Sequence, residues 1–210
     1  MLTLYDCATA PSPRRARIFL AEKGLAHATV PVDLRSREQL GEAYRQINPE
    51  ATVPALRTED GQVWTDNAAI AAYLEARYPH PPLLGVTPAE KAEVASWNGR
   101  AEFEGLMAIA EAFRNSTPAM AQRALPGVVD YPQIPALAER GLARIDHFFD
   151  QLNARLAGRA FIATERFSVA DITAVVAVDF ARIVKRQPGE AHPHLLRWRA
   201  ALAQRPSMAL

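Results

Sequence analysis

The sequence has only one cysteine, Cys7, among its 210 residues. A single thiol cannot form an intramolecular disulfide, and no group of Cys and His residues has the spacing of zinc ligands. No apolar run approaches the roughly 20 residues that span a bilayer, and no export signal opens the chain. We therefore expect a soluble, cytoplasmic protein without disulfides or a metal, whose stability depends on packing.

An excess of charge of either sign is also missing. The 24 Lys and Arg residues nearly balance the 23 Asp and Glu residues, so the formal net charge is +1. The basic residues are spread along the chain, whereas polyanions and membrane surfaces attract basic clusters. We therefore expect no nucleic-acid partner and no membrane partner.

What the chain does have is a change of pattern near residue 88. Short strand and helix patterns alternate before it, and only helical patterns follow it. The stretch YPHPPLLGVTP lies between them, and its prolines cannot continue a helix. We predict a first domain over residues 1–80 and a second over 88–210, joined by a linker at 79–87.

The first part reads strand, helix, strand, helix, hairpin, helix, which predicts a four-stranded mixed sheet flanked by helices. The expected elements are a strand at 2–5, a helix at 13–23 ended by Gly24, a strand at 28–32, a helix carrying Leu40, Tyr44 and Ile47, a hairpin around Asp60-Gly61, and a helix over DNAAIAAYLEARY with Asn67 as its N-cap.

The second part predicts an all-helical bundle, so the fold class is α/β plus all-α. Its expected helices cover 87–113, 135–156, 169–184 and 195–203. Ser168 and Asp171 form an S-x-x-D capping box before the third of these. We assign that motif to folding rather than to a site.

The first candidate site is Thr52, Val53 and Pro54, in the stretch NPEATVPAL. A proline at the entry of a strand is usually trans and protects a sheet edge. The alternative is a cis Val-Pro bond, which turns the backbone N–H and C=O of Val53 outward to pair with an extended peptide. The sequence leaves both interpretations open.

The second candidate is Asp66 with Asn67, at the start of a helix. Their position suits capping alone, because acidic and amide side chains are favoured at helix N-termini. The functional alternative is that free amides at this terminus bind a carboxylate while Asp66 binds an amine. The pair would then recognise an amino-acid zwitterion.

The stretch YDCATAPSPRRAR, residues 5–17, contains the third group: Cys7, Thr9 and Ser12. Cys7 fits a small buried apolar residue, and the two hydroxyls fit a turn and a helix cap. None has a His or Lys neighbour in sequence that would make it a nucleophile. A helix N-terminus, a hydroxyl and nearby arginines do stabilise a thiolate, which a ligand would have to supply.

Four ordered motifs carry a resemblance over nearly the whole chain: APSPRRARIFLAEKGL, INPEATVPAL, TDNAAIAAYLEARYP and FSVADITA. Together they resemble a bacterial cytosolic glutathione S-transferase. The resemblance implies a thioredoxin-like domain followed by an all-helical domain. It also implies a homodimer that uses glutathione as co-substrate and takes a small hydrophobic electrophile in the cleft between the domains.

The same resemblance assigns roles to the candidate residues. Val53, before a cis Pro54, would pair with the cysteinyl part of glutathione, and Asp66 and Asn67 would read its γ-glutamyl end. Arg35 or Arg37 would bind the glycine carboxylate. Thr52 departs from the family pattern, because a longer polar side chain often precedes the Val-Pro pair.

The position that contacts the glutathione thiol in the family is where this sequence differs most from the family pattern. Ala10 stands where several classes of the family carry a serine or cysteine, so Ser12 is the first candidate for the thiolate donor, followed by Thr9 and Cys7. Residues 10–13 lack the Cys-x-x-Cys of a thiol-disulfide enzyme. We expect a glutathione transferase active in detoxification; the alternatives are a glutathione-dependent isomerase or dehalogenase, or a non-catalytic binding or scaffold protein.

Overall fold

The structure is a computed structural model that describes residues 1–210, and it divides into two compact units. Unit 1 comprises Met1–Pro81 with Leu125–Asp130 and Leu210, and unit 2 comprises Pro82–Ala124 and Tyr131–Ala209. None of the helices is both long and apolar enough to span a membrane.

Unit 1 contains the predicted four-stranded mixed sheet. Its strands β1 (Leu2–Asp6), β2 (His27–Pro31), β3 (Ala55–Arg57) and β4 (Val63–Trp64) lie in the order β2-β1-β3-β4. β1 and β2 are parallel, and the other neighbours are antiparallel. The turn between β3 and β4 contains Gly61 at φ +88°, which confirms the hairpin predicted from Asp60-Gly61.

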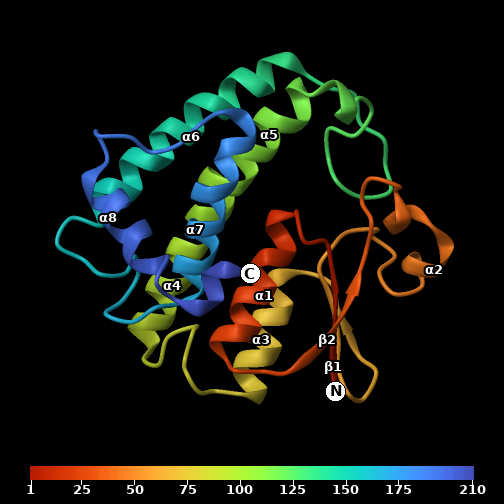
Figure 1. The fold of residues 1–210 in the computed structure, drawn as a ribbon, viewed down its shortest axis with the longest axis horizontal. Coiled ribbons are helices and arrows are strands. Elements are labelled where there is room, and N and C mark those ends of the chain that lie inside the picture. Colours follow the sequence, from red (N-terminus) through yellow and green to blue (C-terminus); the bar gives the residue numbers. More distant parts are fainter. The chain divides into compact units, whose positions relative to one another are not determined.

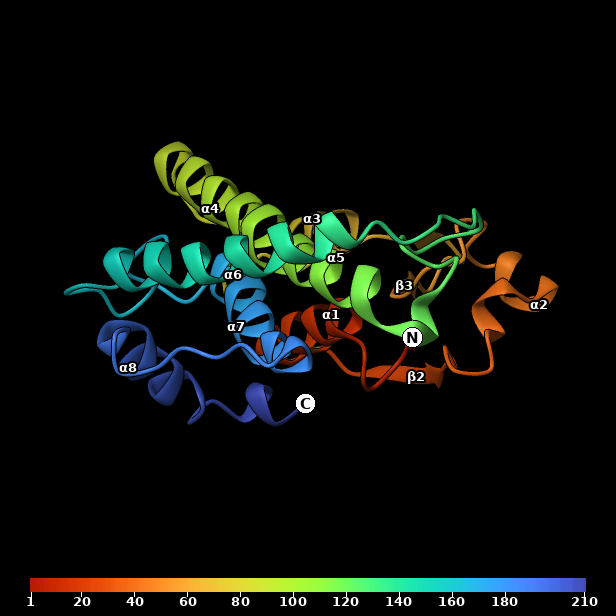
Figure 2. The same cartoon turned by 90° about the horizontal axis from the view of Figure 1, so that it is seen from above.

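Helices cover both faces of this sheet. α1 (Pro11–Glu22) and α3 (Asn67–Arg77) pack against each other on one face, and the short α2 (Glu42–Arg45) lies on the other, as Figures 1 and 2 show. Leu4 of β1, Ile18 of α1 and Leu56 of β3 are fully buried. α1 and α3, whose N-termini carry two of the candidate sites, therefore belong to the same unit and are in contact.

The helix expected around Leu40, Tyr44 and Ile47 is not continuous. A 3₁₀ turn, η1 (Glu38–Leu40), is separated from α2 by Gly41, whose backbone is extended at φ −69° and ψ 153°. Tyr44 is nevertheless buried, in a small cluster with Tyr5, Val32 and Ala55. The apolar spacing therefore predicted the burial of Tyr44 correctly and the helix wrongly.

The regular secondary structure of unit 2 is helical apart from an isolated β-bridge between Arg123 and Tyr131, which agrees with the predicted bundle. Its helices are α4 (Pro88–Arg100), α5 (Met107–Ser116), α6 (Pro135–Arg155), α7 (Val169–Phe180) and α8 (Pro193–Leu202), with 3₁₀ turns at Pro118–Met120, Ala181–Val184 and Pro206–Ala209. α7 supplies the centre of the core, because almost all its side chains are buried.

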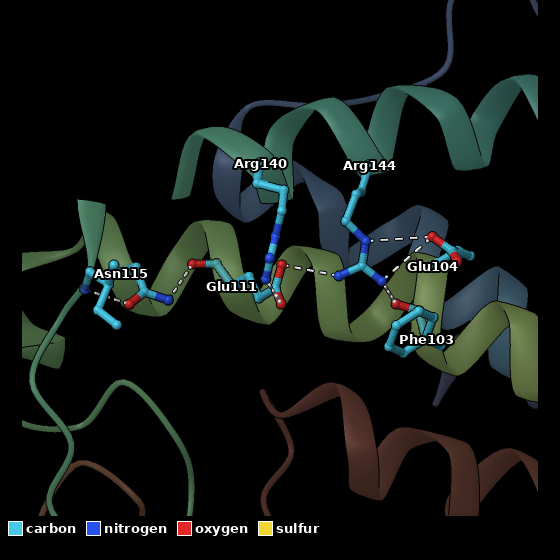
Figure 3. Close-up of polar contacts among 7 residues, drawn as sticks. Phe103, Glu104, Glu111, Asn115, Arg140 and Arg144 are labelled. Atoms are coloured by element: carbon cyan, nitrogen blue, oxygen red, sulfur yellow. Dashed lines mark hydrogen bonds and ion pairs between the residues drawn. The ribbon is translucent and has the colours of Figure 1, made fainter. Parts of the chain in front are cut away.

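The helix expected over 87–113 contains a π-helical segment, Ala101–Leu106, between α4 and α5. Arg144 of α6 donates to the Phe103 carbonyl of this segment and pairs with Glu104 and Glu111 (Figure 3). A Cβ on Gly105 would lie 2.8 Å from the ring of Phe148. The wider turn thus lets a glycine pack closely on α6 while Arg144 satisfies an exposed carbonyl.

The capping box predicted before α7 is confirmed. The carboxylate of Asp171 accepts hydrogen bonds from the backbone amide and the hydroxyl of Ser168, both at 3.1 Å. It also accepts from the Ile162 amide at 3.0 Å and from the indole of Trp198 at 3.2 Å. The motif therefore stabilises the start of α7 and also ties that start to a distant loop and to α8.

Candidate functional site

The N-terminus of α1 presents Ser12, the first candidate for the thiol contact. A turn in which the Ala10 amide donates to the Cys7 carbonyl at 2.9 Å leads into the helix, which begins at Pro11, two residues before the predicted start. Pro11 and Pro13 have no N–H. Ser12 therefore carries the only backbone donor among the first three helical residues, together with its hydroxyl.

Ser12 is joined to the second candidate site. The side-chain amide of Asn67 donates to the Ser12 Oγ at 2.9 Å and to the Ser12 carbonyl at 3.1 Å. The two residues are 55 positions apart in the chain. This contact brings the N-termini of α1 and α3 together.

The capping prediction at α3 needs a correction, because Asp66 rather than Asn67 is the N-cap. Asp66 has an extended backbone, and its carboxylate accepts from the Ala69 amide at 2.7 Å. Asn67 is the first helical residue, and the NH₂ group of its side chain donates to Ser12. The backbone amides of Asn67 and Ala68 have no partner within the chain, so this terminus can bind an anion beside the exposed Asp66.

The Val53-Pro54 peptide bond is cis, the second of the two forms considered. Neither the amide nor the carbonyl of Val53 makes a hydrogen bond within the chain. The carbonyl of Thr52, in contrast, accepts from the Tyr44 hydroxyl at 2.6 Å and from the Asn48 side chain at 2.8 Å. The backbone of Val53 is therefore available to an extended peptide, on a segment fixed just before it.

Tyr44 and Asn48 are the supporting residues that the sequence did not single out. Burial raises the pKa of Tyr44 to about 12, and its hydroxyl donates to the Thr52 carbonyl. Asn48 is fully buried, and its side chain also contacts the Thr52 hydroxyl at 3.0 Å. In the sequence, the one hint of this role was that Asn48 precedes Pro49 and lies four residues before Thr52. Tyr44 gave no such hint, because it fitted the apolar spacing of the expected helix.

The charge of Arg17 in α1 is less available to stabilise a thiolate than the sequence suggested. Arg17 pairs with Asp6 at 2.5 Å and donates to the Ala8 carbonyl at 3.1 Å. Arg14 donates to the carbonyl of Leu210 at 3.1 Å, and Arg15 is buried. The charge of Arg17 is thus paired inside the protein, where it holds the loop before α1 in place.

Cys7 and Thr9 form a separate group from Ser12. The Cys7 sulfur lies 3.6 Å from the Thr9 hydroxyl, in the turn before α1. Cys7 is half-buried and Thr9 is exposed. No hydrogen bond joins either side chain to Ser12 or Asn67, so only Ser12 is connected to the start of α3.

Arg35 and Arg37 lie on the exposed loop between β2 and η1, and neither guanidinium makes a hydrogen bond or an ion pair within the chain, although the charge of Arg35 acts on Asp33. Asp33 shapes this loop by accepting from the Arg35 amide at 2.8 Å. That hydrogen bond, followed by one from the Ser36 hydroxyl, lowers the pKa of Asp33. No contact joins either arginine to the Ser12–Asn67 pair, so the choice between them stays a prediction.

Comparison with known proteins gives full-length relatives. Residues 9–77 match the family model "Glutathione S-transferase, N-terminal domain". Residues 116–206 match the family model "Glutathione S-transferase, C-terminal domain". Glutathione S-transferase 2 of Saccharomyces cerevisiae is 34% identical over 99% of this chain and 88% of its own length.

Two further similarities differ in extent. The crystal structure of a glutathione S-transferase domain-containing protein of Marinobacter aquaeolei VT8 is 36% identical with a TM-score of 0.89, covering 98% of this chain and 99% of that one. Maleylacetoacetate isomerase of Pseudomonas aeruginosa is 40% identical, but over 43% of this chain and 44% of its own length.

Proposed function

Because the chain belongs to the glutathione S-transferase family, we propose that it binds glutathione through unit 1, ionises the thiol and transfers the sulfur to a hydrophobic electrophile. One observation carries this proposal. The hydrogen bond between Asn67 and Ser12 places a hydroxyl suited to a thiolate beside a helix N-terminus suited to a carboxylate.

The free groups of unit 1 match the chemistry of a γ-glutamyl tripeptide. The amides of Asn67 and Ala68 would bind the γ-glutamyl carboxylate, and Asp66 would bind the amine. The backbone of Val53 would pair with the cysteinyl residue. Arg35 or Arg37 would pair with the glycine carboxylate. Homodimer formation is also proposed, on the family resemblance.

The chemical step would need no nucleophile from the protein. The Ser12 hydroxyl donates a hydrogen bond to the sulfur, and the thiol proton leaves to solvent. The thiolate then forms a bond to the electrophilic carbon as the leaving group departs with its electron pair. Lowering a cysteine pKa from about 8.5 to about 6.5 takes roughly 2.7 kcal/mol. A hydrogen bond to a charged acceptor supplies about 1.5–3 kcal/mol of this.

The test is a pH titration of the thiolate absorbance of bound glutathione in the wild type and in Ser12→Ala. The wild type is expected to show a depressed thiol pKa. Ser12→Ala is expected to raise that pKa by about 1 to 2, with a loss of kcat/KM at neutral pH of about 10- to 100-fold.

Thr9→Val and Cys7→Ala are the matched controls for Ser12→Ala, because each removes one of the other candidate groups and should leave the thiol pKa in place. An unchanged pKa in Ser12→Ala would transfer the role to Thr9, Cys7 or the backbone. Absence of glutathione binding by the wild type would refute the proposed function.

A glutathione-dependent isomerase is the second candidate, favoured by the similarity to maleylacetoacetate isomerase. There the thiolate would add to the substrate and later leave it, so glutathione would not be consumed. Quantifying glutathione after many turnovers separates the two reactions. Stoichiometric loss with appearance of a conjugate supports the transferase, and a constant concentration supports the isomerase.

A further inference from the structure

The contact between Asn67 and Ser12 fixes the direction of a hydroxyl proton. The Ser12 carbonyl can only accept, so the Asn67 group that lies 3.1 Å from it must be the NH₂ end of the amide. The same nitrogen lies 2.9 Å from the Ser12 Oγ, which therefore accepts as well. A serine hydroxyl has one proton and two lone pairs, and its proton must then point away from Asn67.

We propose that Asn67 is a positioning residue for thiol ionisation, acting through Ser12 rather than by reading the γ-glutamyl group with its side chain. Occupying one lone pair of the Ser12 Oγ keeps the proton free for the sulfur and makes the hydroxyl a stronger donor. The side-chain NH₂ group is engaged by Ser12, so the backbone amide is the donor that Asn67 still offers to the ligand. This inference rests on the proposed function.

Two substitutions of Asn67 should raise the pKa of the bound thiol by different amounts. Asn67→Ala leaves the Ser12 hydroxyl free to rotate, so donation to the sulfur becomes one of several orientations. Asn67→Asp substitutes an acceptor for the donor, which draws the Ser12 proton towards the carboxylate. The added negative charge also disfavours a neighbouring thiolate. The aspartate variant should therefore have the higher thiol pKa.

Two measurements separate positioning from substrate recognition. The first is the pKa of the bound glutathione thiol, and the second is the affinity for S-methylglutathione, which keeps the γ-glutamyl group but has no ionisable thiol. We expect Asn67→Ala to raise the thiol pKa by about 0.5 to 1 and Asn67→Asp by more than about 1. We expect Asn67→Ala to change S-methylglutathione affinity less than about 3-fold, since only a side-chain contact outside the ligand is lost.

The controls test whether Asn67 acts through Ser12. In Ser12→Ala/Asn67→Ala the thiol pKa should be no higher than in Ser12→Ala alone, because the effect of Asn67 needs the hydroxyl. Asp66→Asn keeps the capping oxygen of α3 but removes its charge. It should weaken S-methylglutathione binding without raising the thiol pKa.

Each outcome decides the inference. A depressed wild-type pKa that neither Asn67 variant changes would overturn it, and so would additive shifts in the double variant. A large loss of S-methylglutathione affinity at an unchanged thiol pKa would also overturn it, because it would show that the Asn67 side chain binds the γ-glutamyl group. A wild-type pKa that is not depressed would overturn the proposed function and this inference together. Retained S-methylglutathione binding shows that a variant is folded.

Discussion

Asp171→Ala is expected to lower the free energy of unfolding by about 4 kcal/mol. The Asp171 carboxylate is fully buried and accepts hydrogen bonds from Ile162, Ser168 and Trp198. Alanine would leave two backbone amides and an indole N–H without partners in the core of unit 2, where water cannot replace the carboxylate. Denaturant unfolding followed by circular dichroism measures the loss.

The matched control is Ser168→Ala, which keeps the carboxylate and removes the Ser168 hydroxyl, both as a donor to Asp171 and as the cap of α7; it should cost about 1 to 2 kcal/mol. Comparable small losses in both variants would show that the network contributes little. A large loss confined to Asp171→Ala would show that the carboxylate itself organises the loop, α7 and α8.

The same carboxyl should make stability depend on pH. Burial raises the pKa of Asp171 from 3.8 to about 6, against the opposing effect of its hydrogen bonds. Between these values the native protein binds a proton that the unfolded chain has released. The contribution of Asp171 is therefore fully present below about pH 4, falls as pH rises through 6, and is about 3 kcal/mol lower at pH 7.

Asp171→Asn cannot titrate, so comparing it with the wild type isolates this effect from other groups. The difference in unfolding free energy between the two proteins should shift in favour of the variant as pH rises from 4 to 7. A constant difference over this range would contradict the raised pKa.

Local patterns predicted most of the fold, because the interactions behind them are local. The S-x-x-D motif requires contacts over three residues, and the Asp60-Gly61 turn requires one left-handed backbone. The π-helical segment was missed since its open carbonyl is satisfied by Arg144, about 40 positions away. The break at Gly41 was missed because an apolar stripe alone does not show where a backbone leaves the helix.

The candidate site was predictable as a set of residues but not as an arrangement. Motif order pointed to Ser12, Val53 and Asp66, each at the end of an element. The contact between Ser12 and Asn67 spans 55 residues, so no sequence spacing could show it. The cap of α3 is Asp66 instead, whose carboxylate accepts from the Ala69 amide while the side-chain NH₂ group of Asn67 donates to Ser12.

Asn48→Ala is expected to lower the free energy of unfolding by about 3 kcal/mol and to weaken glutathione binding by about 10- to 30-fold. The buried side chain of Asn48 donates to the carbonyl and hydroxyl of Thr52 and accepts from the Glu50 amide at 3.1 Å. Its loss would release the segment that presents Val53. Calorimetric titration with S-methylglutathione, at a temperature where the variant is folded, measures the binding.

Thr52→Val is the matched control, because it removes the hydroxyl contact of Asn48 and leaves the Thr52 carbonyl in place. It should cost at most about 1 kcal/mol of stability, with little change in binding. Tyr44→Phe removes the other donor to that carbonyl, so its effect should not add to that of Asn48→Ala. An Asn48→Ala protein that loses stability but binds S-methylglutathione as tightly as the wild type would show that glutathione does not pair with Val53, since a displaced backbone edge cannot keep the hydrogen bonds of an extended ligand.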